Sequence, residues 1–239
     1  MSKLLFRPAL LLILFSCFFL TAHSASALNS AAIISEQQLE LLQKIQKKYR
    51  DLTSLRFNFS QTVQSNGRRR FGEGNSIFYR SVPGRPGIMR WNYTKPDPQI
   101  ILNDGKNLSI YTQIDKQLLV TPSGDLQTDI TYSFFAGSHT LLDDFTIFPA
   151  SKRFVGISEK ALLAVQLIPK QAHGQVKTIH LWFDNQYSIR KLVMEDHFDT
   201  VTELLFTEVK FDTLPADSVE TANNLVQLNL PPETEIIRQ

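Results

Sequence analysis

Apolar positions recur at two different spacings along the chain, and each spacing predicts a different kind of element. Between Leu39 and Tyr49 they recur every three or four residues, which predicts an amphipathic helix over residues 35–50. Ser35 and Gln38 stand at the start of this segment with capping-box spacing, so we expect Ser35 to be the N-cap. A helix with a single apolar stripe needs an apolar surface to cover.

Most of the remaining chain alternates between apolar and polar residues, which predicts β-strands with one face on a core. Phe57 and Phe59 share one face of the first such strand, and Met89 and Trp91 share one face of another. The predicted strands cover residues 56–63, 72–80, 87–93, 99–103, 107–112, 117–121, 153–158, 162–168, 176–184, 189–196, 201–211 and 225–230.

Turn signals and an irregular segment separate these strands. Asn66-Gly67 and Asp104-Gly105 are typical of two-residue hairpin turns, and the glycines at positions 72 and 74 predict a bulge or bend within a strand. Residues 122–144 lack alternation and predict short helices and loop. Short strands at steady spacing, with no internal repeat, favour a mainly β (α+β) fold built on one antiparallel sheet or barrel with appended helices.

The predicted inward-facing residues Phe57, Phe59, Met89 and Trp91 are large and apolar. If the sheet curls into a barrel of more than about eight strands, its own side chains do not fill the interior, which then holds a cavity, a ligand or a plug. The helix at 35–50 and the irregular segment at 122–144 would be available to cover such an opening. A packed sandwich core without a cavity explains the same alternation, and periodicity alone does not choose between the two.

The first 27 residues have the organisation of a secretory signal peptide. Lys3 and Arg7 precede an apolar run over residues 9–20, and Ala25-Ser26-Ala27 matches an A-x-A cleavage site. We therefore expect cleavage after Ala27, export to the periplasm, and a single domain over residues 28–239. An uncleaved anchor is the alternative, but the apolar run is well short of the ~20 residues that span a bilayer.

Cys17 is the only cysteine in the sequence, and it lies inside this leader. Cleavage after Ala27 leaves a mature chain with no thiol for disulfide, nucleophilic or metal chemistry. The alternative is lipidation, because residues 14–17 have the rough form of a lipobox. The apolar run continues beyond Cys17, which favours a signal-peptide interior over a lipobox.

Composition and charge exclude several classes of protein. The chain is 43% apolar and 20% charged, which is ordinary for a globular protein. Removing Lys3 and Arg7 with the leader leaves 23 basic and 23 acidic residues, so the mature chain is neutral. A neutral chain has no electrostatic footprint for nucleic acid or for an anionic membrane, and we expect no nucleic-acid partner.

Catalytic and metal-binding motifs are missing from the sequence. No nucleophile elbow, zinc-binding HExxH, Walker loop or dinucleotide fingerprint occurs, and His139, His173, His180 and His197 lack partners at metal-ligand spacing. We therefore expect no enzyme, no metal and no cofactor. Arg68-Arg69-Arg70 after the Asn66-Gly67 turn is either a docking point for an acidic partner or a solvated hairpin tip, and we favour the tip.

Three consecutive segments carry a family resemblance: RPGIMRWNY (residues 85–93), PDPQII (96–101) and NDGKNLSIY (103–111). In this order and spacing they resemble the periplasmic outer-membrane lipoprotein carrier family, LolA. The segments LTSLRFNFSQT (52–62) and VQLIPK (165–170), and Phe211 with LPP (230–232), are similar to further parts of that family. The resemblance covers most of residues 35–237.

The resemblance implies a fold and a function. The fold is an incomplete antiparallel β-barrel of about eleven strands, with helices lidding an apolar cavity. The function is that of a periplasmic chaperone, expected to act as a monomer. It would carry acylated lipoproteins from an inner-membrane lipoprotein-releasing ABC transporter to an outer-membrane acceptor.

The resemblance also implies roles for individual residues. Arg85 matches the arginine that latches the lid to the barrel, and Phe57, Phe59, Met89 and Trp91 are the expected lining of the acyl-chain cavity. A second hypothesis keeps the same pocket in a lipid-binding acceptor or lipid sensor, anchored to a membrane through lipidated Cys17.

Overall fold

A computed structural model describes residues 34–80, 87–123, 141–151, 153–154, 163–171 and 176–239. These residues belong to one compact unit, Ala31–Gln239. The predictions for the signal peptide, Cys17, Arg85 and most of residues 122–144 lie outside the described residues.

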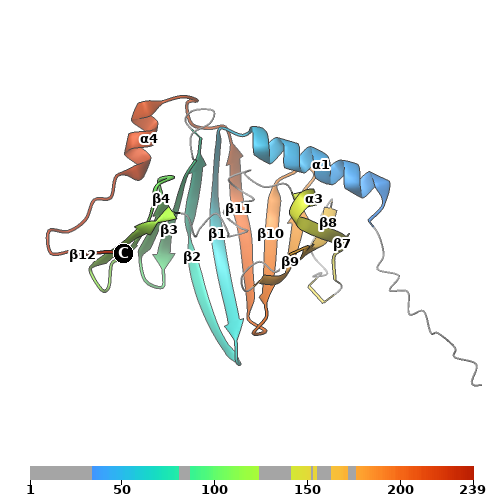
Figure 1. Cartoon of the computed structure of the whole chain (residues 1–239), viewed down its shortest axis with the longest axis horizontal. Coiled ribbons are helices and arrows are strands. Elements are labelled where there is room, and N and C mark those ends of the chain that lie inside the picture. Colours follow the sequence, from blue (N-terminus) through green and yellow to red (C-terminus); the bar gives the residue numbers. More distant parts are fainter. Residues whose placement is uncertain (1–33, 81–86, 124–140, 152, 155–162, 172–175) are drawn as a thin grey trace, which may run out of the picture. The chain divides into compact units, whose positions relative to one another are not determined.

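The described strands form a single twelve-stranded sheet with the order β12-β6-β5-β4-β3-β2-β1-β11-β10-β9-β8-β7 (Figure 1). Their bounds are β1 Ser54–Ser65, β2 Arg68–Tyr79, β3 Ile88–Lys95, β4 Gln99–Asn103, β5 Asn107–Thr112, β6 Gln117–Pro122, β7 Phe145–Pro149, β8 Leu163–Pro169, β9 Val176–Phe183, β10 Ile189–Asp196, β11 Val201–Phe211 and β12 Glu235–Arg238. The described helices are α1 Glu36–Asp51, α3 Leu141–Asp144 and α4 Val219–Val226.

The sheet is curled and open, since β12 and β7 are edges that do not pair with each other. This confirms the predicted mainly β fold and incomplete barrel. One edge differs from the expectation: β12 pairs in parallel with β6, whereas the other neighbouring strands are antiparallel. The parallel strand follows from the long return of the chain after β11, through α4, to the far edge of the sheet.

The local turn and cap signals are confirmed. Asn66 and Gly67 have φ of 49° and 73°, as expected for a hairpin turn of the primed type. At the start of α1 the Gln38 amide donates to Ser35 Oγ (3.2 Å), and the Ser35 amide donates to Gln38 Oε1 (3.0 Å). This reciprocal pair is the capping box that the sequence predicted.

One predicted strand is wrong, another is described only at its first two residues, which lie in a turn, and two strands were missed. The predicted strand at 225–230 overlaps the end of α4, where Leu225, Val226 and Leu228 pack against buried Tyr79 and its neighbours. Arg153 and Phe154 lie in a turn rather than at the start of a strand, and the rest of that predicted strand is outside the described residues. The missed strands are β7, which pairs with β8 at one edge of the sheet, and β12, which pairs with β6 at the other edge.

The two faces of the sheet carry different covers. We call the face with Phe57 and Leu181 the inner face and the opposite face the outer face. Helix α4 packs on the outer face, where the Tyr79 hydroxyl donates to Pro215 O (2.7 Å) and accepts from the Ser218 amide (3.0 Å). Arg90 holds the other end of α4 through the carbonyls of residues 225 and 227, at 3.0 and 2.8 Å.

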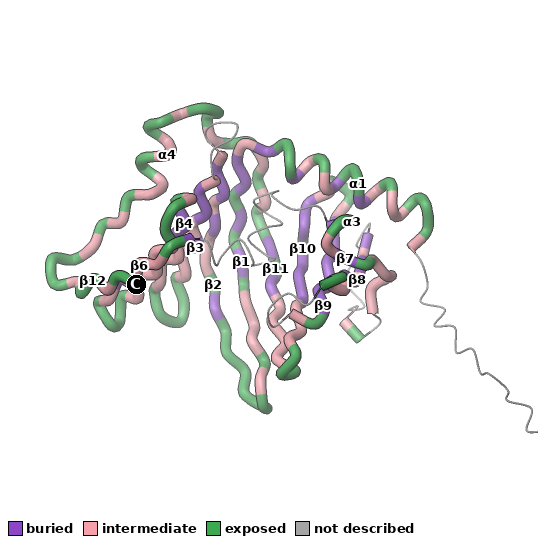
Figure 2. Tube along the Cα trace, viewed as in Figure 1, coloured by how far each residue is buried: buried purple, intermediate pink, exposed green. Residues whose placement is uncertain are grey.

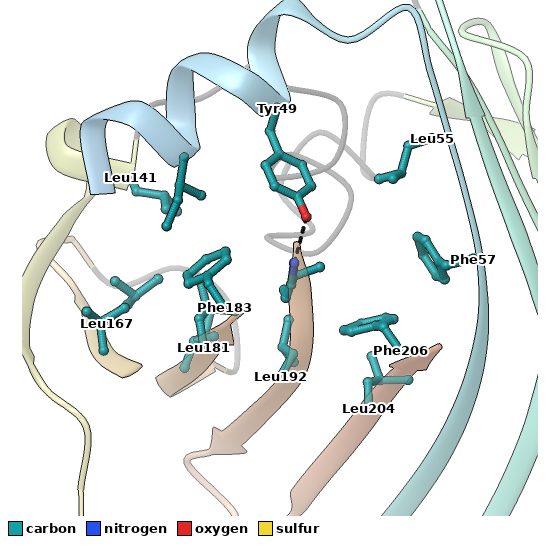
Figure 3. Packing of buried hydrophobic residues seen from close by; sticks show 14 of the residues in the cluster. Tyr49, Leu55, Phe57, Leu141, Leu167, Leu181, Phe183, Leu192, Leu204 and Phe206 are labelled. Atoms are coloured by element: carbon teal, nitrogen blue, oxygen red, sulfur yellow. Dashed lines mark hydrogen bonds between the residues drawn. The ribbon is translucent and has the colours of Figure 1, made fainter. Parts of the chain in front are cut away.

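Helix α1 covers part of the inner face with the fully buried side chains of Leu42, Ile45 and Tyr49 (Figure 3). The Tyr49 hydroxyl accepts a hydrogen bond of 2.8 Å from the Ile189 amide at the start of β10. Burial raises the pKa of Tyr49 well above its usual range, so the hydroxyl stays neutral.

Polar contacts hold the last turn of α1 in the same position. Lys48 Nζ donates to Gln186 O (2.7 Å) and lies 3.6 Å from the centroid of the Phe211 ring. The Arg80 guanidinium donates to the Arg50 carbonyl. The C-terminal end of α1 is therefore tied to the β9–β10 turn, to β11 and to the end of β2.

Replacing Tyr49 with Phe is expected to lower the free energy of unfolding by about 1–3 kcal/mol, because the buried Ile189 amide loses its acceptor while the ring is kept. Urea denaturation measures the difference. Tyr187→Phe, in the adjacent β9–β10 turn, is the control and should change stability by less than about 0.5 kcal/mol. Equal effects from the two variants would contradict the role assigned to the Tyr49 hydroxyl.

His180 predicts a pH dependence of stability. It is buried on the outer side of β9 beside Phe154 (4.8 Å between ring centroids), its Nδ1 has no hydrogen-bond partner in the structure, and burial lowers its pKa. The unfolded chain then binds the proton more tightly, so stability falls as pH drops below about 6.5, by at most about 1.4 kcal/mol per pH unit. His180→Phe should be less sensitive between pH 7.5 and 5.5, measured by urea denaturation.

Exposed His197 serves as the control for this experiment, because His197→Asn should leave the pH dependence unchanged. The same loss between pH 7.5 and 5.5 in the wild type and in His180→Phe would show that another group is responsible.

Candidate functional site

An aromatic row crosses the inner face at the middle of the sheet. It consists of Phe57 and Phe59 from β1, Phe78 from β2, Trp91 and Tyr93 from β3, and Phe206 from β11. The ring centroids of Phe57 and Phe206 are 4.9 Å apart, and those of Phe59 and Trp91 are 4.6 Å apart. Edge-to-face and tilted pairs of this kind add about 0.5–1.5 kcal/mol each beyond the area they bury.

The structure brings together the four residues that the sequence singled out. Phe57, Phe59, Met89 and Trp91 lie in one core cluster and are 2%, 3%, 5% and 7% exposed. The alternation within β1 and β3 places them on one face, and the antiparallel pairing of β1, β2 and β3 places them side by side. At this burial a ligand reaches them only when the groups that cover them move.

Two glycines of β2 give the aromatic rings their room. A Cβ on Gly74 would lie 2.0 Å from the Asn92 carbonyl oxygen and 2.9 Å from the Phe59 ring. A Cβ on Gly72 would lie 3.1 Å from the Tyr93 ring. The β2–β3 register shifts between Glu73 and Gly74, which confirms the irregularity that the glycines predicted.

The inner face continues as an apolar surface beneath α1. Figure 3 shows Leu181, Phe183, Leu192, Leu204 and Phe206 directed towards the space below Tyr49. These residues alternate on β9, β10 and β11 as clearly as Phe57 and Phe59 do on β1, but the sequence alone did not single them out. They share a face with Phe57 because β11 pairs with β1, and these two strands lie far apart in the sequence.

Two polar side chains interrupt the inner face near the aromatic row. Ser76 lies in register with Phe57 and Trp91, and Asn103 lies in register with Met89. Both residues are buried, and in the structure Ser76 Oγ and Asn103 Nδ2 have no hydrogen-bond partner. They are donors available to a ligand that carries carbonyl oxygens next to apolar chains.

The outer face carries a pocket of a different character. It has a volume of about 320 Å³, and most of its lining side chains are polar or charged, among them Arg56, Asn58, Asn75, Glu208 and Lys210. This polar lining does not suit an apolar ligand. The inner face is therefore the candidate site for an apolar ligand.

Neither a cluster of metal-binding side chains nor a membrane-spanning helix occurs among the described residues. Within them, no three His, Cys, Asp or Glu side chains come together in a way that could hold a metal ion. None of the described helices has the length and apolar character needed to cross a bilayer.

Known proteins of one family are similar to this chain in sequence. The family described as outer membrane lipoprotein carrier protein LolA matches residues 50–219. An outer-membrane lipoprotein carrier protein of Nitrosomonas europaea is 30% identical over 184 residues, covering 76% of this chain and 81% of the relative. One of Legionella pneumophila is 25% identical over 213 residues, covering 88% of this chain and 94% of the relative.

A solved structure supports the fold independently. An uncharacterised conserved protein from Thermus thermophilus superposes with a TM-score of 0.51 at 14% identity, covering 85% of this chain and 100% of that protein. The curled open sheet with its apolar inner face, the match over residues 50–219 and the Nitrosomonas relative lead to one assignment. The chain belongs to the outer membrane lipoprotein carrier protein LolA family.

Proposed function

We propose that this protein is a periplasmic carrier that binds the acyl chains of lipoproteins on the inner face of its sheet. The observation that carries the proposal is the aromatic row, which belongs to an apolar inner face that helix α1 covers in part, where a packed sandwich would place a second sheet. The curated relatives are outer-membrane lipoprotein carrier proteins. LolA carriers are not enzymes, and a carrier of this kind needs no catalytic residue.

The proposed transport path runs from an inner-membrane ABC transporter that releases lipoproteins to an acceptor on the outer membrane. Burying one CH₂ group contributes about 0.8 kcal/mol, so a fully buried sixteen-carbon chain would contribute about 12 kcal/mol. Three such chains would exceed the ceiling of about 18–21 kcal/mol for non-covalent binding. The carrier therefore buries its cargo incompletely, or it loses affinity when its cover changes position.

Helix α1 is the described element that such a change would involve. Its apolar stripe occupies part of the inner face, while Tyr49, Lys48 and Arg80 form polar contacts at its C-terminal end. Displacing the Leu42 and Ile45 side chains would free apolar surface for a ligand without breaking those contacts. Arg85 is proposed as a latch for the cover, as the family resemblance implies.

Native mass spectrometry of the protein purified from its own periplasm tests the function directly. The expected result is a fraction of the protein with bound acylated lipoprotein, and a mature chain that begins at residue 28. A chain that begins with acylated Cys17 would instead support a membrane-anchored acceptor or lipid sensor with the same pocket. A ligand-free chain, together with no uptake of any acyl probe, would refute both.

Met89→Glu is expected to weaken binding of a fluorescent acyl probe at least tenfold, because it places a carboxylate within the apolar inner face. Fluorescence titration measures binding, and thermal melting checks the fold. Ile77→Glu is the matched control, since it adds the same charge to the outer face of the neighbouring strand and should leave binding intact. A folded Met89→Glu protein with unchanged binding would contradict the proposed site.

Arg85→Leu is expected to take up lipoprotein as well as the wild type but to pass it on poorly, because a cover without its latch no longer competes with bound cargo. Loading and hand-off are measured separately with purified transporter and acceptor. Normal hand-off by the variant would refute the latch.

A further inference from the structure

Two hairpins of central strands end close together, at the end of the strands that lies far from α1 (Figure 1). The β1–β2 turn at Asn66-Gly67 lies beside the β10–β11 turn, because Gln64 pairs with Val201 and Thr200 Oγ1 donates to Ser65 Oγ (3.2 Å). We call residues 65–71 and 197–200 the hairpin tip. The proposed carrier function assigns no role to it.

Two aromatic side chains of the hairpin tip stand in solvent. Phe71 is 63% exposed and Phe198 is 70% exposed, and Figure 2 shows both turns as exposed segments. Phe198 is held in place by its loop: the Asp196 carboxylate accepts hydrogen bonds from the Phe198 amide (2.8 Å) and the Thr200 amide (2.7 Å). Exposing two phenyl rings on adjacent hairpins is unfavourable in water, which points to a partner that covers them.

Three basic side chains belong to the same hairpin tip. Arg68, Arg69 and Arg70 are all exposed, and alternation along β2 places the first and third on the inner side and the second on the outer side with Phe71. Arg69 lies 5.8 Å from the centroid of the Phe71 ring. The positive charge therefore surrounds the tip on both sides and does not lie on one face.

The nearby acidic groups do not neutralise this charge. Glu73 pairs with Lys95 (3.0 Å), and Asp199 pairs with Lys177 (3.5 Å). The Asp196 carboxylate is occupied by the two backbone amides of its own loop. The hairpin tip is thus a basic, aromatic ridge on a chain whose mature form is neutral overall.

The ridge projects beyond its neighbour on one side. Pairing between β2 and β3 begins only at Glu73 and Lys95, so residues 68–72 of β2 have no partner strand on that edge. Arginines on a free edge also prevent strand-to-strand aggregation. Protection of the free edge would explain the arginines, but it would not explain exposed aromatic rings on two different hairpins.

We propose that the hairpin tip binds the surface of a lipid bilayer that contains anionic phospholipids. Phe71 and Phe198 enter the headgroup region, and the three arginines contact lipid phosphates. A convex ridge with charge on both sides suits a planar anionic surface better than the shaped pocket of an acidic protein. This interaction needs no acyl chain on the inner face and is independent of the proposed carrier site.

Vesicle flotation with the mature chain tests this proposal, with vesicles of phosphatidylcholine alone and with added phosphatidylglycerol. The wild type should bind the anionic vesicles, and added salt should weaken binding. Each arginine near an anionic surface contributes about fivefold to partitioning, so the Arg68→Ser, Arg69→Ser, Arg70→Ser triple variant should bind about a hundredfold more weakly. Phe71→Ser with Phe198→Ser should also weaken binding, including at high salt.

Matched controls come from exposed residues outside the tip. Lys44→Ser, Lys106→Ser and Arg238→Ser remove three charges, and Ile114→Ser removes a side chain as exposed as Phe198. These controls should bind anionic vesicles more tightly than the tip variants. Equal binding by tip and control variants, or no preference of the wild type for anionic vesicles, would overturn the proposal and leave an acidic protein as the partner. Self-association of the arginine variant, with vesicle binding unchanged, would assign the arginines to edge protection.

Discussion

An open sheet with a largely apolar inner face must keep that face from water, and the rest of this structure depends on how it does so. The aromatic row lies near the middle of the strand order, where β1 pairs with β2 and β11, and the apolar surface continues under α1 across β8 to β11. A sheet of twelve strands leaves too wide an inner face for its own side chains to cover. The helix that completes the fold therefore occupies the same surface that a ligand would use.

Each face of the sheet is covered in part by a helix that hydrogen bonds hold in place, but the two helices are held differently. On the outer face, Tyr79 and Arg90 hold both ends of α4, so that helix is a fixed part of the core. On the inner face, hydrogen bonds between described residues hold the C-terminal end of α1 at Lys48, Tyr49 and Arg50. In the proposed carrier, this end would stay in place while the other turns of α1 move to admit a ligand.

Local signals in the sequence predicted local structure well. The full set of residues on the inner face could not be predicted without knowing the order of the strands in the sheet. Ser35 with Gln38 and Asn66 with Gly67 act over a few residues, so the cap and the turn could be predicted. The apolar residues at 225–228 were assigned to a strand, but they lie at and just after the C-terminal end of α4 and pack against buried Tyr79 and its neighbours. The Tyr49–Ile189 contact joins residues 140 positions apart, and no local pattern encodes it. Phe57, Phe59, Met89 and Trp91 were chosen from alternation and lie together in the structure. The residues of β9 to β11 on the same face could not be chosen in this way, because their position depends on the pairing of β11 with β1.

The central claim is that acyl chains bind on the inner face, and the two tryptophans of the chain can test it separately. Trp91 lies in the aromatic row, whereas Trp182 lies on the outer side of β9 beside Lys191. Single-tryptophan variants Trp182→Phe and Trp91→Phe are titrated with an acyl ligand brominated along its chain, which quenches indole fluorescence on contact. The account predicts strong quenching of Trp91 and little quenching of Trp182. Equal quenching of both, or quenching of Trp182 alone, would contradict it.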